Sequence, residues 1–409
     1  MKKRMITMVA IVSCLGSIQA QSIQPAVIFS DAEKQTRVML AEIPKAKSTG
    51  SAAVGATPGS EGQPLVSPKT LDKGVLKLVP ARDWTSGFFP GSLWFLYEYT
   101  GEQEWKTAAE QYTANIENEK TNGGTHDMGF KIYCSFGNGY RLAPTPHYKE
   151  VIIQSAKTLA TRFNATAGVI KSWDNRTKWK YPVIIDNMMN LELLFAASKL
   201  TGDLSFYKIA VQHANTTMKN HYRADNSSWH VVDYDTATGK VIQKTTHQGY
   251  ADESAWSRGQ AWGLYGYTMC YRFTKDKKYL QHAEKIAAYL LHHANMPKDL
   301  VPYWDYNAPA IPNEERDASA AAIMASGLYE LSIYSKNALL YKASADKIIA
   351  SLTTSYRSPV GDNKGFLLLH SVGSKPGKSD VDEPLDYADY YYLEALLRSK
   401  KLKEKKKLF

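Results

Sequence analysis

Cysteine is scarce in this chain of 409 residues, which contains three. Only Cys134 and Cys270 lie beyond the first 20 residues, so disulfides cannot be the main support of so large a fold. We expect two free, buried thiols instead. Paired CxxC motifs, an HExxH motif and a glycine-rich phosphate loop are also lacking, which argues against zinc-dependent and nucleotide-dependent enzymes. No metal or cofactor is predicted.

Positive charge is in excess, at a formal +10, but it gathers at the two ends of the chain. Lys2, Lys3 and Arg4 open the sequence, and residues 398–409 carry seven basic side chains against Glu404. The remainder is near +1, which gives no support for a nucleic-acid-binding surface. We expect the basic tail at 398–409 to be a solvated, frayed end.

A long apolar run of membrane-spanning length is also missing. Residues 1–20 have a basic start, about a dozen apolar residues and Ala20 before Gln21, the pattern of a secretory signal peptide. The run is too short for a stable membrane anchor, so we expect an exported protein, periplasmic in a bacterium. Residues 11–14 also fit the pattern before a lipidated cysteine, which leaves a lipoprotein anchored through Cys14 as the alternative.

Repetition organises the rest of the chain. Residues 46–70 are rich in Gly, Ser, Pro and Ala, which predicts a long loop within a single domain spanning 21–409. After it, an amphipathic segment with an aromatic near its start recurs as TGEQEW, HYKEV, TGDLSFY, TKDKKY and SKNALLY. The aromatic residues are 43, 59, 72 and 62 residues apart. Each interval accommodates two helices and two loops, which predicts stacked helical hairpins.

A second kind of helical segment alternates with these copies and is richer in Gly, Ala and aromatic residues. The six segments begin RDWTSGFFPG, HDMGFKIY, IIDNMMN, ADESAWSRGQAW, RDASAAAI and LDYADYYY. Such compositions are expected where helices crowd on both sides. Six hairpins closing into a ring give an all-α fold, the (α/α)6 barrel or six-hairpin toroid, with these segments inside. An open right-handed solenoid is the alternative.

The starts of the predicted inner helices are acidic or aromatic. In a closed ring these helices run the same way, so their N-termini meet at one mouth. Aspartate is a favoured helix N-cap, which by itself accounts for any one of the carboxylates. For Asp83 and Asp317 we favour capping, or a pair with the neighbouring Arg82 or Arg316.

Asp127 and Asp186 differ because their neighbours are apolar, as in PVIIDNMM around Asp186. Apolar surroundings disfavour an ionised carboxylate and prepare a carboxyl group to act as a general acid. We therefore predict catalytic roles for both. Asn190 lies one helical turn after Asp186 and is a candidate for orienting its carboxyl group.

Aromatic and cationic residues near the same starts indicate the ligand. Trp84, Trp256 and Trp262 offer flat faces for sugar rings. Arg258 has the planar fork of donors that suits a carboxylate, and His230 or Gln248 could bind hydroxyl groups. A neutral sugar would not need the arginine.

These motifs, together with THDMGF, SSWH and LLHSVGSKP, resemble glycoside hydrolase family 88, the unsaturated glucuronyl hydrolases. The similarity runs from about Arg82 to Leu397. It implies an (α/α)6 barrel and a hydrolase that removes the 4,5-unsaturated uronic acid which polysaccharide lyases leave at the non-reducing end. The substrate partner would be an unsaturated oligosaccharide from a glycosaminoglycan or from ulvan, and no nucleic acid is involved.

The resemblance also implies roles for individual residues. Asp186 would protonate C4 of the sugar and then assist water, and Asp127 would be the second essential carboxylate. The substrate-binding set would be Trp84, His126, His230, Gln248, Arg258, Trp262, Ser371 and Ser374. Lys375 directly follows Ser374, without the spacer of a sulfate-reading pattern, so recognition of sulfate on the next sugar stays open.

Two other functions remain possible at this point. Unsaturated rhamnogalacturonyl hydrolases form a sister family with the same barrel and reaction. A non-catalytic oligosaccharide-binding toroid would keep the aromatic residues and Arg258 but would have no use for both Asp127 and Asp186.

Overall fold

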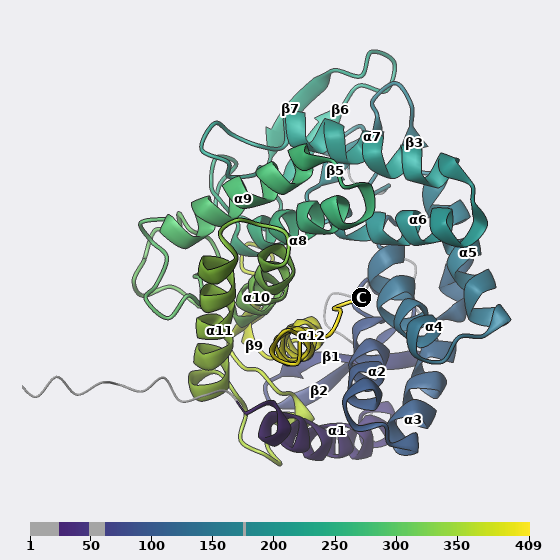
Figure 1. Ribbon diagram of the computed structural model, residues 1–409, viewed down its shortest axis with the longest axis vertical. Coiled ribbons are helices and arrows are strands. Elements are labelled where there is room, and N and C mark those ends of the chain that lie inside the picture. The colour runs from purple at the N-terminus through teal and green to yellow at the C-terminus, as the bar shows by residue number, and fades with distance from the viewer. Residues whose placement is uncertain (1–23, 49–61, 175–176) are drawn as a thin grey trace, which may run out of the picture.

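The computed structural model describes residues 24–48, 62–174 and 177–409 and shows helices arranged around a common centre (Figure 1). The predicted signal peptide and Cys14 fall on residues 1–23, outside the described residues. None of the described helices is long and apolar enough to cross a membrane.

The six inner segments of the sequence all form helices, with one irregularity. The helices of the inner ring are α2 (Phe88–Thr100), the π-helix η2 (Gly129–Gly137) continued by α4 (Asn138–Leu142), α6 (Asn187–Thr201), α8 (Ser257–Thr274), α10 (Ala318–Ser332) and α12 (Asp386–Lys403). Each packs against the next, and α12 packs against α2. The ring is therefore closed, which confirms the (α/α)6 barrel over the open solenoid.

The outer helices are the amphipathic repeat copies. They are α3 (Gln103–Ala114), α5 (Pro146–Ala160), α7 (Leu204–Asn220), α9 (Lys277–His292) and α11 (Ala338–Ser355), joined by the N-terminal α1 (Pro25–Ser48), with short 3₁₀ turns η1 (Glu117–Thr121) and η3 (Asn363–Gly365) between helices. Polar caps start several of them: Asp203 accepts a hydrogen bond from the Ser205 N–H, and Asp276 one from the Lys278 N–H.

Small residues let the inner helices approach one another closely. A side chain added at Gly91 would lie 2.4 Å from the Tyr390 ring, and one at Gly266 would lie 2.6 Å from Cβ of Met188. Both distances are below any allowed contact, so glycine is required there by packing. This is the physical reason for the Gly- and Ala-rich composition of the inner segments.

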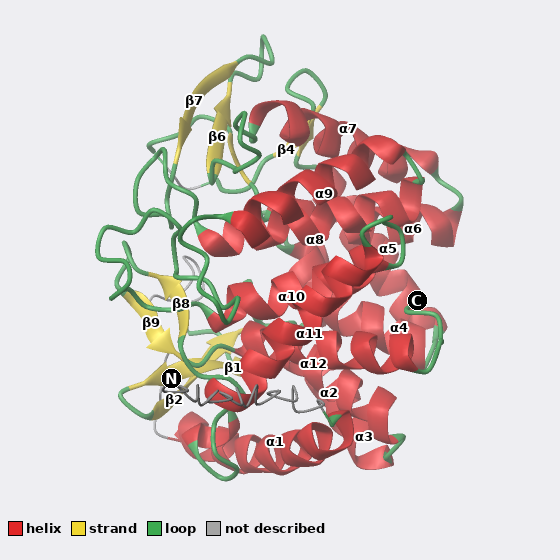
Figure 2. Cartoon of the chain, turned by 60° about the vertical axis from the view of Figure 1, so that its left-hand side comes forward, coloured by secondary structure: helices red, strands yellow, loops and turns green. Residues whose placement is uncertain are grey.

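Short strands gather at one end of the helices (Figure 2). They are β1 (Leu65–Asp72) with β2 (Val75–Pro80), β3 (Phe163–Asn164) with β4 (Val169–Ile170), β5 (Pro182–Ile184) with β6 (Val231–Tyr234) and β7 (Val241–Thr245), and β8 (Ser371–Ser374) with β9 (Ser379–Glu383), all antiparallel. Several of them lead directly into inner helices, so this end is the mouth where the N-termini meet.

The predicted loop at 46–70 is wrong at both of its ends. Helix α1 continues to Ser48 and β1 begins at Leu65, while residues 49–61 lie outside the description. The turn after β1 places Lys73 and Gly74 at φ 51° and 78°, the left-handed conformation of a tight hairpin turn. The strand lacks the alternation of a half-buried strand because both of its faces are largely covered, so its sequence carries no period of two.

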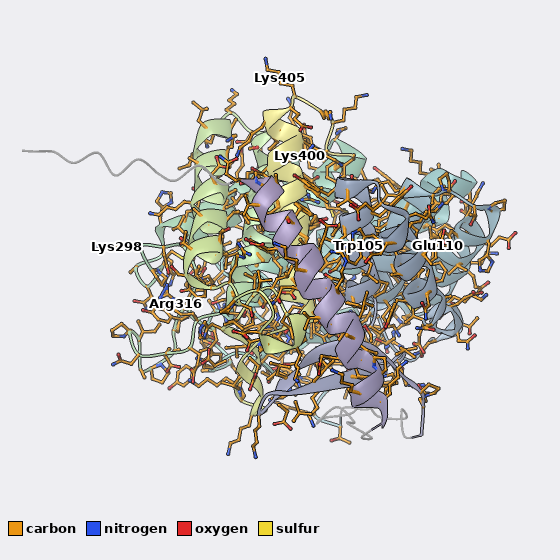
Figure 3. The ribbon with its side chains drawn as sticks, turned by 90° about the horizontal axis from the view of Figure 1, so that it is seen from below. Trp105, Glu110, Lys298, Arg316, Lys400 and Lys405 are labelled. Atoms are coloured by element: carbon orange, nitrogen blue, oxygen red, sulfur yellow. The ribbon has the colours of Figure 1, made fainter. Side chains whose placement is uncertain are left out.

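The prediction of a solvated, frayed tail is wrong about the fraying: residues 398–403 belong to α12 and Leu408 is buried, whereas residues 403–407 are exposed as expected. Lys400 in the last turn of α12 and Lys405 just after the helix lie far from Arg316 (Figure 3). The chain then turns back toward the barrel (Figure 1). Leu408 is only 7% exposed and its carbonyl accepts a hydrogen bond from Lys401 Nζ at 3.1 Å. The Arg272 guanidinium lies 3.8 Å from the centre of the Phe409 ring. Burial of Leu408 thus holds the end of the chain on the barrel, while Phe409 is 49% exposed and the lysines before it face solvent.

Behind this C-terminal segment lies a cavity of about 800 Å³. Its walls include Phe130, Tyr391, Arg272 and Phe409. Phe130 and Tyr391 also contact the ring of Trp262, at 5.1 and 5.4 Å between ring centres. An aromatic layer therefore separates the cavity from the mouth of the barrel.

Removing Leu408 and Phe409 should lower the free energy of unfolding by about 2 kcal/mol, since burying one leucine contributes about that much. Urea unfolding of the truncated chain measures this loss. Leu339 is 86% exposed, so Leu339→Ser is the matched control and should change stability by less than about 0.5 kcal/mol. Equal midpoints for the full and truncated chains would show that the tail contributes nothing.

Candidate active site

The carboxyl group of Asp186 occupies the N-cap position of α6 but does not cap it. Its backbone is helical, at φ −55° and ψ −26°, and its side chain accepts no capping hydrogen bond from the described residues. The residue is 7% exposed, and Oδ2 has no hydrogen-bond partner in the described part of the chain. Capping is thereby excluded as the reason for this aspartate.

Burial raises the pKa of Asp186 from its ordinary 3.8 to about 7. The charge of Arg258 opposes the rise, and the nearby charge of Asp127 adds to it. At neutral pH a substantial fraction of Asp186 is therefore protonated. This bears out the expectation drawn from its apolar neighbours.

Asp127 lies just before η2, with Thr125 and His126 beside its carboxyl group. Thr125 Oγ1 donates a hydrogen bond to its Oδ2 at 2.7 Å, and His126 Nε2 lies 3.2 Å from its Oδ1. The side chain keeps 15% exposure. Burial lowers the pKa of His126, so this histidine is neutral at physiological pH. Asp127 is thus the more accessible of the two carboxylates.

His230, at the entry to β6, is fixed in one tautomer. The backbone N–H groups of His247 and Gln248 both donate to its Nδ1, at 3.0 and 3.1 Å. Burial lowers its pKa well below the ordinary value, so the ring is neutral and its single proton must be on Nε2. Nε2 lies 3.8 Å from Asp186 Oδ2, which places an N–H donor beside the candidate acid.

Gln248 joins this group through its side chain. Its Nε2 donates to the Gly373 carbonyl on β8 at 3.1 Å. The residue therefore ties the loop that carries it to the strand that carries Ser371.

Arg258 is buried and its terminal nitrogens are already engaged. Nη1 pairs with Asp317 Oδ2 at 3.2 Å and also donates to the Val372 carbonyl, while Nη2 donates to the Gly373 carbonyl at 2.7 Å. Only Nε has no partner among the described residues. The predicted two-pronged grip on a carboxylate is therefore not available, because the fork of donors holds β8 against α8 and α10.

The predicted aromatic residues meet at the mouth. Trp84 is partly exposed and packs on Tyr387, with 4.9 Å between ring centres, and on Phe130, at 5.5 Å. Trp262 is fully buried, and its indole Nε1 has no partner at hydrogen-bond geometry in the described residues, but it lies close enough to Asp186 to lower the pKa of that carboxyl group. Trp84 can therefore offer a face to a sugar, whereas Trp262 can offer a donor.

Ser371, Ser374 and Lys375 have different environments in the structure. Ser371 is buried, with a hydroxyl group that has no partner among residues 62–174 and 177–409. Ser374 Oγ accepts a hydrogen bond from Gly377 N–H within its own hairpin turn. Lys375 is neither free nor merely solvated, because its ammonium pairs with Glu314 at 2.5 Å and with Glu315.

Several of the buried donors without partners in the described chain belong to residues of this site. They include His230 Nε2, Trp262 Nε1, Arg258 Nε, Asn190 Nδ2 and Ser371 Oγ. Buried polar groups left unpaired are costly, so such a set indicates a ligand that completes it. Donors predominate, which suits a ligand rich in acceptor oxygens.

The family model described as Glycosyl Hydrolase Family 88 matches residues 68–392. The chain belongs to glycoside hydrolase family 88. It is 52% identical over 336 residues to the unsaturated glucuronyl hydrolase of Formosa agariphila, covering 81% of this chain and 84% of that protein. An unsaturated chondroitin disaccharide hydrolase of Streptococcus pyogenes is 35% identical over 324 residues, or 77% of this chain and 81% of its own.

Solved structures agree with the family assignment. The crystal structure of an unsaturated glucuronyl hydrolase specific for heparin superimposes with a TM-score of 0.84 at 42% identity, over 93% of this chain and 99% of that one. The family assignment favours the glucuronyl hydrolases over the sister rhamnogalacturonyl group.

Asn190 does not orient Asp186 as predicted. Its Oδ1 accepts a hydrogen bond from the Phe130 N–H at 3.1 Å, so the amide ties α6 to the start of η2 beside Asp127. The spacing of one helical turn predicts that Asn190 lies on the same helix face as Asp186. It does not predict which group donates a hydrogen bond to the amide oxygen.

Asp317 and Asp83 were each predicted to cap a helix or to pair with the neighbouring arginine, and the two residues differ in the structure. Asp317 caps α10 through the Ser319 N–H at 3.0 Å, but the arginine that pairs with it is Arg258, because Arg316 pairs with Asp299. Asp83 does not cap α2, whose N-cap is Gly87; it accepts hydrogen bonds from the backbone and hydroxyl of Thr85 and lies 3.9 Å from Lys69 Nζ.

Lys69 is a residue of the mouth that the sequence did not reveal, since it lies in the wrongly assigned loop. Its ammonium is buried, 3.4 Å from Asp380 and 3.9 Å from Asp83. Asp386 is a third carboxyl group nearby, and burial raises its pKa well above the ordinary range, which favours its protonated form. Lys69 therefore sits at the seam where the first and last inner helices meet.

No metal site emerges from the described residues, in which no group of three or more His, Cys, Asp or Glu side chains comes together as ligands. Cys134 and Cys270 are free thiols, and Cys270 is buried whereas Cys134 is partly so.

The raised pKa of Asp186 makes its stability contribution fall as pH rises from about 4 to about 7, because over this range only the unfolded chain has released the proton. Asp186→Asn has no ionisable group at this position. Its free energy of unfolding, relative to that of the wild type, should therefore rise by at most about 4 kcal/mol between about pH 4 and about pH 7. Urea unfolding of both proteins at pH 5 and pH 8 measures the change. Asp203 has a lowered pKa, so its stability contribution changes only below about pH 4. Asp203→Asn is therefore a control whose gap from the wild type should be the same at pH 5 and pH 8. A pH-independent gap between wild type and Asp186→Asn would contradict the assignment.

Proposed function

We propose that this chain hydrolyses oligosaccharides that end in a 4,5-unsaturated uronic acid, releasing that sugar by hydration of its C4=C5 vinyl ether. The observation that carries the proposal is the buried, partly protonated Asp186 carboxyl, with the Nε2–H of His230 at 3.8 Å from Oδ2. Membership of family 88 supports it, since the relatives named above are hydrolases of unsaturated uronic acid products by their names.

The first chemical step is proton transfer from Asp186 to C4. It leaves positive charge at C5, shared with the ring oxygen, and a carboxylate on Asp186. The Nε2–H of His230 faces that carboxylate and stabilises the charge as it develops. Arg258 adds a fixed positive charge close enough to lower the pKa of Asp186.

Water then adds to C5 and gives a proton to the Asp186 carboxylate. The product is a hemiketal whose ring opens to a ketone at C5 and a hemiacetal at C1, and the hemiacetal releases the aglycone as an alcohol. The glycosidic bond is broken without attack at C1, unlike the two-carboxylate scheme of most glycosidases. Asp127 keeps access to the mouth and is assigned to holding the sugar or the water.

The donors without partners around Asp186 are assigned to the uronate and the hydroxyl groups of the sugar. Nε of Arg258, Nε1 of Trp262 and the hydroxyl of Ser371 are the groups available for them. Trp84 provides the aromatic face. A non-catalytic toroid would give no reason for a carboxyl group with a raised pKa beside a histidine of fixed tautomer.

For the aglycone we propose a sugar from a glycosaminoglycan, with ulvan as a second source. The named substrates of relatives, chondroitin disaccharides and heparin products, support the glycosaminoglycan class. Such ends are produced by polysaccharide lyases, so the enzyme would act after one. Export through residues 1–20 fits a role in degrading extracellular polysaccharide.

The direct test follows the loss of ultraviolet absorbance of the conjugated double bond with a panel of lyase-made disaccharides. We expect turnover of at least one, with kcat/KM falling as pH rises through about 7, where Asp186 loses its proton. Asp186→Asn should reduce kcat by at least about 10³-fold while the variant still binds substrate. No absorbance change with any member of the panel would refute the enzymatic function, and a near-normal rate in Asp186→Asn would refute the role of this residue.

Lys375 should contribute little to recognition of sulfate, because Glu314 and Glu315 already neutralise it. We expect Lys375→Ala to change the ratio of kcat/KM for a sulfated and an unsulfated disaccharide by less than about threefold, a difference under 1 kcal/mol. The double variant Glu314→Gln, Glu315→Gln is the complement, since it frees the ammonium and should favour the sulfated substrate. A tenfold loss of preference in Lys375→Ala would show that the lysine reads sulfate despite its partners.

A further inference from the structure

The loop at residues 246–250 determines which nitrogen of His230 carries the proton. Two of its backbone N–H groups, those of His247 and Gln248, converge on Nδ1. Without them, either tautomer of a neutral imidazole would be open to the ring. The tautomer of His230 therefore depends on the position of this loop.

The side chain of Asp305 binds this loop through hydrogen bonds. Its Oδ2 accepts hydrogen bonds from the Tyr250 N–H at 2.9 Å and from Ser254 Oγ at 2.7 Å. A side chain at Gly249 would lie 3.1 Å from the same oxygen and 2.7 Å from Thr246 Oγ1, so the loop lies directly against the carboxyl group. Asp305 is 0% exposed and faces no solvent.

The backbone of Asp305 is itself anchored to the start of α8. Asp305 forms a backbone bridge with Trp256, and its Oδ1 accepts the Asn307 N–H at 2.8 Å. Trp256 in turn packs on the ring of His230, with 4.7 Å between ring centres. Trp256 and Asp305 therefore hold His230 in two ways. Trp256 packs on the face of the imidazole ring, and Asp305 binds the loop whose N–H groups donate to Nδ1.

We propose that Asp305 is a positioning residue which, by holding the 246–250 loop, fixes His230 with its proton on Nε2, facing Asp186. This inference rests on the proposed function. If the loop loosened, Nδ1 would lose its two donors and could take the proton. Nε2 would then be an acceptor, which favours the protonated form of Asp186 and opposes transfer of its proton to the sugar.

The test combines nitrogen NMR of the ring with kinetics. Histidine labelled with ¹⁵N reports which ring nitrogen carries hydrogen, and His230 is assigned by comparison with His230→Gln. In the wild type we expect a protonated Nε2 and a bare Nδ1. Asp305→Ala should populate the other tautomer and lower kcat by up to about 10²-fold, with a smaller change in KM. Asp305→Asn keeps one acceptor oxygen and should restore most of both signals.

Asp235 provides the matched control, since its Oδ1 also organises a loop by accepting the Ala237 and Thr238 N–H groups, at 3.0 and 2.8 Å. Asp235→Ala should leave the His230 tautomer and kcat unchanged. If Asp305→Ala does not fold, Ser254→Ala, which removes one of the two hydrogen bonds to Oδ2, replaces it under the same criteria.

Three results would overturn the proposal: a protonated Nδ1 in the wild type, an unchanged tautomer in Asp305→Ala, or an altered tautomer with an unchanged rate. Absence of turnover by the wild type would contradict the proposed function instead. The ring resonances would still show whether Asp305 sets the tautomer.

Discussion

The chemistry of this barrel depends on one constraint, the removal of the Asp186 carboxyl group from water without a hydrogen-bond partner for Oδ2 among the described residues. Desolvation disfavours the ionised form, so the proton is retained to neutral pH. An ordinary cap at the same helix position would have supplied N–H donors and favoured the charged form instead. The helical backbone at Asp186 directs its side chain away from that use.

The surroundings of Asp186 are built to keep this arrangement rigid. Arg258 ties α8 to Asp317 at the start of α10 and to the carbonyls of β8, so a charge in the barrel core also fixes the strand that carries Ser371. Lys69 has a similar place at the seam between α2 and α12, among Asp83, Asp380 and Asp386. Each cation is buried with carboxylates close by, as burial of a charge requires. Ring closure and site geometry are thus held by the same contacts.

The sequence patterns predicted those features that depend on neighbouring or periodically spaced residues. The amphipathic copies, the Gly- and Ala-rich inner segments and the polar starts follow from periodicity and packing, and all six inner helices were found where expected. The apolar run before Asp186 likewise indicated its environment correctly. Errors arose where distant segments decide the outcome: β1 is stabilised by β2 and by the start of α12, and the C-terminal residues by Arg272 and Lys401.

The sequence by itself determined that the chain forms helical hairpins, that acidic and aromatic residues begin the inner ones, and that Asp127 and Asp186 stand apart from capping residues. These properties depend on the order of side chains along a helix, which periodicity reveals. Only the tertiary structure decided that Arg258 is occupied by β8, that Asn190 serves η2, that His230 carries its proton on Nε2, and that Lys375 is neutralised. Each of these depends on which atoms from remote segments meet, and a hydrogen bond formed across the barrel leaves no periodic trace in the chain.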